Sequence, residues 1–312
     1  MTAGSVSPLA PAVRSAALVL ALAASLGTSA ACGMIKHKAM GMVADSLSAG
    51  GDTFTRDDDP DLVGAALPTL LKVYESLLDS DPKNPKLLTA TCAAFTQYAY
   101  GWVEADSEAA EFASHEEGKR LQGRALRLLL RAKGYCVRAL EVRFPGISKI
   151  LIQDPKPAIA KASGKDLDTL YWTAASWGLA ISLQTDLAID LPSVRALAER
   201  ALAIDETWNH GALHEILITL DSQSQAVGGN EARAREHFAR AVELQKGLSP
   251  GPYFSLAMGV SVANQNREEF QKLMNQALAI DPEKDPGNRL VILLAQKRAR
   301  VQLDHIDTLF AK

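Results

Sequence analysis

Two histidines, His210 and His214, lie four residues apart in a stretch with helical spacing. On a helix, this separation can place both imidazoles on one zinc ion. Residue 211 is a glycine, so the glutamate of the zinc-protease helix motif is missing, and no third ligand is indicated. We therefore expect no metal site at these histidines.

Acidic residues form two further groups that are candidates for chemistry. Residues 57–59 are three aspartates followed by Pro60, which is typical of a capped helix start rather than a cation site. The second group is expected to form a solvated helix face and consists of Glu104, Asp106, Glu108, Glu111, Glu116 and Glu117. Paired catalytic carboxylates cannot be recognised from spacing alone.

Motifs of common enzyme classes are missing from the sequence. It has no glycine-rich phosphate loop, no dinucleotide-binding fingerprint and no Gly-x-Ser-x-Gly nucleophile motif. We therefore expect a protein that is not an enzyme and that uses no cofactor.

The first of the three cysteines, Cys32, follows a segment typical of an export signal. Residues 1–31 contain one basic residue, Arg14, then an apolar run and a stretch of small residues. Small residues directly before Cys32 match the bacterial lipobox, except that Ser29 stands where leucine is usual. We expect cleavage before Cys32 and attachment of a lipid to its thiol. Gly33 as the next residue favours the inner leaflet of the outer membrane.

Two other outcomes for this segment remain open. Cleavage after Ala31 by the general signal peptidase would release a protein without a lipid. An uncleaved anchor is the other alternative, because residues 15–35 carry no charge, although half of that run is poorly apolar. The remaining cysteines, Cys92 and Cys136, are expected to be buried unpaired thiols, with a redox pair as the alternative in an exported protein.

Aromatic residues gather in two short stretches of the chain. Burial in a helical core explains such clusters without any function, but tyrosine and tryptophan are also enriched where proteins bind partners. The candidate cleft or interface residues are Phe95, Tyr98, Tyr100, Trp102, Tyr171, Trp172 and Trp177.

Helices are the elements that must position these side chains. The sequence has 312 residues, 47% hydrophobic and 22% charged, with a net charge of -3, which favours a globular protein and disfavours nucleic-acid binding. No sustained alternation of period two occurs beyond residue 31, whereas apolar residues recur at helical spacing. Proline and glycine interrupt the pattern near residues 82, 145, 192, 228, 250 and 282.

An internal repeat favours a particular all-α architecture. Ala-Leu-Ala-Ile-Asp at residues 201–205 recurs at residues 277–281, with a related stretch at residues 241–245 between them. Small and large apolar residues at fixed offsets before a helix stop are typical of the tetratricopeptide repeat of about 34 residues. We expect an all-α, tetratricopeptide-like array of antiparallel helix pairs in an irregular solenoid. Residues 32–55 would form a tether and N-terminal segment, and residues 56–312 a single helical domain.

Several longer stretches together resemble the TatT family, the T component of tripartite ATP-independent periplasmic (TRAP) transporter systems. They include Asp-Asp-Asp-Pro-Asp-Leu at residues 57–62, Phe-Thr-Gln-Tyr-Ala-Tyr at residues 95–100 and the Tyr-Trp pair at residues 171–172. Others begin with Gly-Gly-Asn-Glu at residue 228 and Leu-Ala-Gln-Lys at residue 294. The resemblance extends over nearly all of the chain beyond Cys32.

The resemblance implies an accessory role in transport. It implies a periplasmic, tetratricopeptide-like lipoprotein that forms homotrimers and has an apolar cleft in each protomer. The implied partner is the periplasmic solute-binding P subunit, to which the protein would dock and hand over a hydrophobic or organic-acid ligand. The alternative is a general tetratricopeptide scaffold that binds peptides or proteins in the cell envelope.

Overall fold

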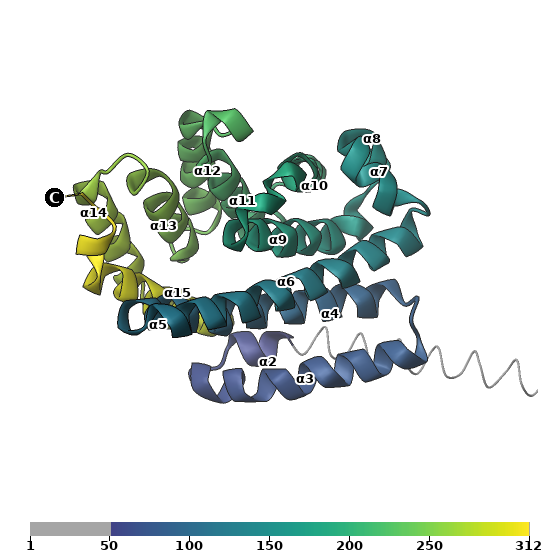
Figure 1. The fold of residues 1–312 in the computed structure, drawn as a ribbon, viewed down its shortest axis with the longest axis horizontal. Coiled ribbons are helices and arrows are strands. Elements are labelled where there is room, and N and C mark those ends of the chain that lie inside the picture. The colour runs from purple at the N-terminus through teal and green to yellow at the C-terminus, as the bar shows by residue number, and fades with distance from the viewer. Residues whose placement is uncertain (1–50, 312) are drawn as a thin grey trace, which may run out of the picture.

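The computed structural model describes residues 51–311 as a stack of helices without a strand in that range. Figure 1 shows the helices following one another from the N-terminal pair at the bottom to the C-terminal helices at the left. The all-α prediction is confirmed. The predicted signal segment and Cys32 lie outside the described residues.

The N-terminal half is built around one long helix. The first elements are α2 (Gly51–Thr55), α3 (Pro60–Ser80), α4 (Pro85–Tyr98), a π-helix (Ala99–Glu104), α5 (Ala105–Ala113) and α6 (His115–Arg143). With 29 residues, α6 runs through the middle of Figure 1. It packs against α4 and, further along the chain, against α9 (Leu167–Leu183), and these two helices also contact each other.

The C-terminal half consists of shorter helices that pack on their chain neighbours. Two short helices precede α9, namely α7 (Ile147–Gln153) and α8 (Pro155–Ile159). After α9 come α10 (Leu191–Ile204), α11 (Ala212–Asp221), α12 (Glu231–Leu244), α13 (Gly251–Leu256), a second π-helix (Ala257–Ser261), α14 (Arg267–Leu278) and α15 (Arg289–Asp304). No helix in residues 51–311 is both long and apolar enough to cross a membrane.

Local signals in the sequence explain where these helices begin. The Asp59 side chain accepts hydrogen bonds from the backbone N–H groups of Asp61 and Leu62, and Pro60 occupies the first turn of α3. These contacts satisfy donors that a helix start leaves open. The expectation that residues 57–59 mark a helix start is therefore confirmed.

The predicted apolar faces of α10, α12 and α14 form part of the core. The fully buried residues of these faces include Val194, Leu197, Ala198, Ala201, Ala234, Ala241, Phe270, Met274 and Ala277. Burial of apolar surface contributes about 25 cal/mol per Å². These faces are thus the main reason that the three helices adopt their positions.

The two remaining cysteines are joined, so the prediction of unpaired thiols is wrong. Cys92 of α4 and Cys136 of α6 form a disulfide with a Cα–Cα distance of 5.5 Å, and both are fully buried. The pairing could not be predicted across a sequence separation of 44, because spacing alone does not show which helix faces meet. A disulfide persists in an oxidising compartment, which agrees with export.

Helix α15 returns to the N-terminal half of the chain. It contacts α2, α3 and α5 as well as α13 and α14, and in Figure 1 it runs behind α5. Leu290 near its start belongs to the core cluster of α3, α4 and α6, while Ala299 belongs to the cluster of α12 to α14. The last long helix therefore ties the beginning of the stack to its end.

Candidate functional site

Three of the seven candidate aromatic residues lie in the core. Phe95, Tyr98 and Trp177 are exposed by only 2%, 8% and 1%. The Tyr98 hydroxyl accepts a hydrogen bond from Arg124 at 3.0 Å, and the Trp177 indole N–H donates one to Asp190 at 3.0 Å. The structure places these rings where they stabilise helix packing.

Trp102 fixes the first π-helix to α3. Its indole N–H donates a hydrogen bond to the carbonyl oxygen of Pro60 at 2.8 Å. The ring lies so close to Gly64 that a Cβ atom there would be 2.4 Å from the indole nitrogen. Gly64 is thus required for the close approach of the ring, and Trp102 has a positioning role.

The other three candidate rings, Tyr100, Tyr171 and Trp172, keep part of their surface exposed. The Tyr171 ring centroid lies 4.9 Å from that of Trp172 and 4.7 Å from that of Trp208. Trp208, which the sequence analysis did not single out, belongs to a short turn between α10 and α11. Its signal was weak because it stands alone among polar residues.

Glu215 of α11 lies near these rings. Its Oε1 atom accepts a hydrogen bond from the Gln245 side-chain amide at 2.6 Å. Its Oε2 atom lies against Gly251, where a Cβ atom would be only 2.2 Å away. Burial raises the pKa of Glu215 to about 7, and its charge acts on the hydroxyls of Tyr100 and Tyr171. We call Tyr100, Tyr171, Trp172, Trp208 and Glu215 the ring cluster.

Arg298 of α15 borders the ring cluster. Its guanidinium carbon lies 4.2 Å from the centroid of the Tyr100 ring. Its Nε atom donates to Glu108 at 2.9 Å, and Nη2 lies 3.3 Å from Glu104. Burial by itself would lower the pKa of Arg298, but Tyr100, Glu108 and Glu104 together raise it.

The expectation that the acids from residue 104 onward form a solvated face is wrong for part of the group. Glu104 is only 8% exposed, and burial raises its pKa to about 7 against the opposing charge of Arg298. Glu108 shares the same guanidinium. The partner is about 190 residues away along the chain, so local spacing could not reveal it.

Two members of the ring cluster lie in or next to an uncommon backbone conformation. Tyr100 belongs to the π-helix, a geometry often found at functional sites. Asn209 and His210 follow Trp208 with φ values of 45° and 56°, in the left-handed region. Such residues cost free energy and persist only where the surroundings hold them. His210 therefore does not share a helix with His214, and that expectation is wrong.

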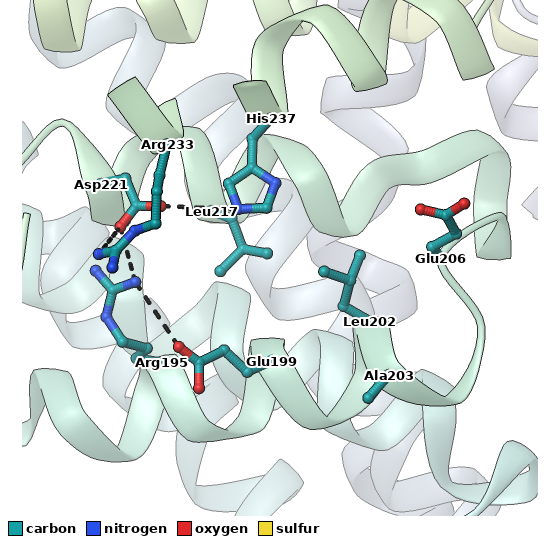
Figure 2. A pocket seen from close by; sticks show the side chains of 9 residues that line it. All are labelled: Arg195, Glu199, Leu202, Ala203, Glu206, Leu217, Asp221, Arg233 and His237. Atoms are coloured by element: carbon teal, nitrogen blue, oxygen red, sulfur yellow. Dashed lines mark hydrogen bonds and ion pairs between the residues drawn. The ribbon is translucent and has the colours of Figure 1, made fainter. Parts of the chain in front are cut away.

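A separate pocket of about 390 Å³ lies over α10, α11 and α12 (Figure 2). It is lined by three apolar residues, Leu202, Ala203 and Leu217, and by the polar side chains of Arg195, Glu199, Glu206, Asp221, Arg233 and His237. In Figure 2 the two arginines and Asp221 gather at one end and Glu206 lies at the other. Asp221 accepts hydrogen bonds from Arg195 and Arg233, each at 2.8 Å.

Two histidines link α11 and α12 beside this pocket. The Nδ1 atoms of His214 and His237 are 2.8 Å apart, so one must donate and the other accept. The outer Nε2 atom of each ring lies 3.7 Å from a carboxylate, Glu206 for His214 and Asp221 for His237. Burial lowers the pKa of both imidazoles. Residues 51–311 contain no group of three or more metal-ligating side chains that could hold an ion.

Comparison with known proteins identifies the family. The model of the TRAP transporter T-component family (TAtT) matches residues 56–310. The chain belongs to this family. A protein of Treponema pallidum (strain Nichols) that carries the name "Uncharacterized protein" is 30% identical over 266 residues, which cover 82% of each chain.

Membership in the T-component family indicates the kind of system in which the protein works. The chain is an accessory component of TRAP transport, and a component of such a system belongs to the periplasm or cell envelope. The family is one of transporter accessory components, which points away from an enzyme. The buried acids and tyrosines are therefore better read as groups for binding and packing than for catalysis.

The histidine pair of this T-component predicts a pH-dependent stability. Folding lowers the pKa of His214 and His237. At mildly acidic pH these two side chains therefore bind more protons in the unfolded chain than in the folded protein. The contribution of this pair to the free energy of unfolding should therefore fall as the pH drops below about 6.5. Glu104 and Glu215, whose pKa values burial raises to about 7, contribute with the opposite sign in both the wild type and a variant without the pair. The charged groups that act on the pair are Arg195, Glu206, Asp221, Arg233, Glu236 and Arg240.

Urea unfolding of the wild type above and below that pH measures the effect. The double variant His214→Gln/His237→Gln is the control, and on acidification the wild type should lose stability relative to it. A difference between the two proteins that stays constant or reverses with falling pH would show that the pair does not exclude a proton on folding.

Proposed function

We propose that the protein is a lipid-anchored accessory subunit that docks the solute-binding P subunit of a TRAP transporter. The observation that carries the proposal is the family match over residues 56–310. In this proposal the ligand passed on through an apolar cleft is a hydrophobic molecule or an organic acid. Transport energy would come from separate membrane subunits.

The anchoring part of the proposal rests on Cys32. In a chain cleaved before this residue, the thiol would carry acyl chains, and each buried methylene contributes about 0.8 kcal/mol to membrane attachment. The inner leaflet of the outer membrane is the proposed location. The Cys92–Cys136 disulfide supports an oxidising compartment.

The assembly part of the proposal is a homotrimer of tetratricopeptide-like protomers. Consecutive contacts from α9 to α14 support a repeat array, with residues 56–312 as one helical domain. Of the four candidate aromatic residues with exposed surface, three are the proposed contacts to ligand or partner, because the fourth, Trp102, is held by its hydrogen bond to Pro60. They are Tyr100, Tyr171 and Trp172.

Replacement of Trp172 by alanine is expected to weaken binding of the P subunit about tenfold or more, as loss of a large aromatic contact does at interfaces. The affinity of the mature chain for the P subunit encoded nearby is measured by pull-down and titration, corrected for the folded fraction. Ile189→Ala is the matched control, because Ile189 is apolar and 86% exposed. A Trp172→Ala protein that loses only stability would count against a contact role.

Native mass spectrometry of the same complex tests the rest of the proposal. Three copies of the chain with bound P subunit are the expected result. A monomer that ignores the P subunit would contradict it and would favour a general scaffold for peptide partners.

A further inference from the structure

Asp221 presents a buried oxygen without a partner to the pocket over α10, α11 and α12. Its side chain is 1% exposed, and its Oδ1 atom accepts hydrogen bonds from Arg195 and Arg233 at 2.8 Å each. Its Oδ2 atom makes no hydrogen bond within residues 51–311, although Asp221 lines the pocket. Native proteins seldom leave a buried carboxylate oxygen unsatisfied. A donor that these residues do not supply is therefore expected at Oδ2.

His237 lies beside this oxygen, and its neighbours indicate where its proton sits. Its Nε2 atom is 3.7 Å from Oδ2 of Asp221, too far for a direct hydrogen bond (Figure 2). Because the Nδ1 atoms of His214 and His237 share one proton, only one of the two outer Nε2 atoms is protonated in the neutral pair. The Nε2 atom of His214 faces Glu206, which is 45% exposed and already paired with Arg240. The buried Asp221 oxygen has no other donor, so the proton is favoured on Nε2 of His237.

A hydroxyl group matches the space between these two atoms. It can accept a hydrogen bond from the Nε2–H group of His237 and donate its own proton to Oδ2 of Asp221. An ammonium group can only donate, and a carboxylate can only accept. Since the two protein atoms are 3.7 Å apart, one oxygen can lie about 2.8 Å from both.

Arg233 offers further donors in the same pocket. Its Nη2 atom bonds to Asp221 and to the carbonyl oxygen of Gly228. Its Nε and Nη1 atoms donate to no acceptor within residues 51–311, and the side chain is 48% exposed. A second oxygen of the same ligand can therefore accept a hydrogen bond from this guanidinium.

The charges around the pocket are balanced. Two arginines and three carboxylates line it, and one of these carboxylates, Glu206, pairs with Arg240 outside the lining. At the edges, Lys156 pairs with Glu199, and Glu243 with Arg240. These groups leave no net charge that would favour an ion over a neutral molecule.

Apolar side chains complete the lining, namely those of Leu202, Ala203 and Leu217. They can pack against the carbon skeleton of a ligand whose oxygens face Asp221 and Arg233. The volume of about 390 Å³ suits a small molecule.

We propose that this pocket is a further binding site, for a small neutral molecule with at least two neighbouring hydroxyl groups. One hydroxyl bridges Asp221 and His237, the next accepts a hydrogen bond from Arg233, and the C–H groups lie against Leu202 and Leu217. The inference goes beyond the proposed function, because it concerns residues outside the ring cluster and does not depend on docking of the P subunit.

Four probes with one cyclohexane ring and different polar groups test the inference: cis-1,2-cyclohexanediol, cyclohexanol, cyclohexanecarboxylate and cyclohexylammonium. Binding to the mature chain is measured by calorimetry at about pH 8, where both imidazoles are neutral because burial lowers their pKa. The diol should bind about tenfold tighter than each of the other probes, because only the diol can make both sets of hydrogen bonds.

Ala203→Trp is the blocking variant. Ala203 lines the pocket and is exposed, so a large side chain there can fill the pocket without removing a buried group. Diol binding should weaken about tenfold or more. Ala203→Ser is the matched control at the same position and should bind the diol within about twofold of the wild type.

Asp221→Asn tests the polar contact directly and should also weaken diol binding about tenfold. Thermal unfolding verifies that this variant folds, and Ala203→Trp decides the question if it does not.

Three results would overturn the inference. Cyclohexanol that binds as tightly as the diol would show that the second hydroxyl has no partner. An ionic probe that binds more tightly than the diol would show that the pocket prefers a charge. Diol binding that is absent at millimolar concentration, or unchanged in Ala203→Trp, would show that the pocket is not the site.

Discussion

Replacement of Arg298 by leucine is expected to lower the free energy of unfolding by about 3–5 kcal/mol, because it leaves buried carboxylates without their cation. Glu104 and Glu108 both pair with this guanidinium, and Glu104 is 8% exposed. Part of the loss would be recovered by protonation of Glu104, whose pKa is already raised to about 7 by burial.

The expected loss is large because Arg298 joins distant parts of the chain. It connects α15 to the region around α5, about 190 residues earlier. Leu290, on the same helix, packs in the core cluster of α3, α4 and α6. Hydrogen exchange in α15 should therefore accelerate in the variant more than exchange in α10 or α12.

Urea unfolding of Arg298→Leu measures the loss. Arg300→Leu is the matched control on the same helix, because Arg300 is exposed, and should stay within about 0.5 kcal/mol of the wild type. The triple variant Glu104→Gln/Glu108→Gln/Arg298→Leu should recover part of the loss, since it removes the unpaired charges. A stable Arg298→Leu protein with unchanged α15 protection would show that the buried ion pairs do not hold the helix in place.

Removal of the disulfide is the second change with a large expected effect. The variant Cys92→Ala/Cys136→Ala should lose about 2–5 kcal/mol of stability, mainly because the unfolded chain regains the freedom of the closed loop. Both sulfur atoms are fully buried between α4 and α6. The folded wild type should therefore resist a reductant that cleaves the disulfide rapidly once the chain is unfolded.

Two measurements check this prediction. Urea unfolding compares the double variant with the wild type, and peptide mass mapping without reduction identifies the cross-linked peptides. Recovery of both cysteines as free thiols from protein purified from an oxidising compartment would contradict the pairing.

Much of the helical architecture could be predicted from local patterns in the sequence. Asp59 before Pro60 marks the start of α3, because a side-chain acceptor and a fixed φ angle act within one turn. The apolar spacing of residues 194–201 gives the buried face of α10, because side chains three and four apart lie together on a helix. The family resemblance likewise depends on order and spacing along the chain.

The contacts between distant helices were decided only by the tertiary structure. From the sequence, Glu104 is expected to be solvated, but in the structure it pairs with Arg298 of α15. Cys92 is likewise expected to be a free thiol, but it forms a disulfide with Cys136 of α6. Of the seven aromatic residues singled out, Phe95, Tyr98 and Trp177 lie in the core, while Tyr100 and Tyr171 lie near Glu215.

The physical reason for this division lies in the range of the interactions. Caps, prolines and amphipathic faces act within a few residues, so the sequence by itself determines the helices and their apolar sides. Ion pairs, disulfides and ring contacts depend on which helix faces meet, and any apolar face can be buried against many others. The partners of Glu215, Arg298 and Cys92 thus became fixed only when the helices packed.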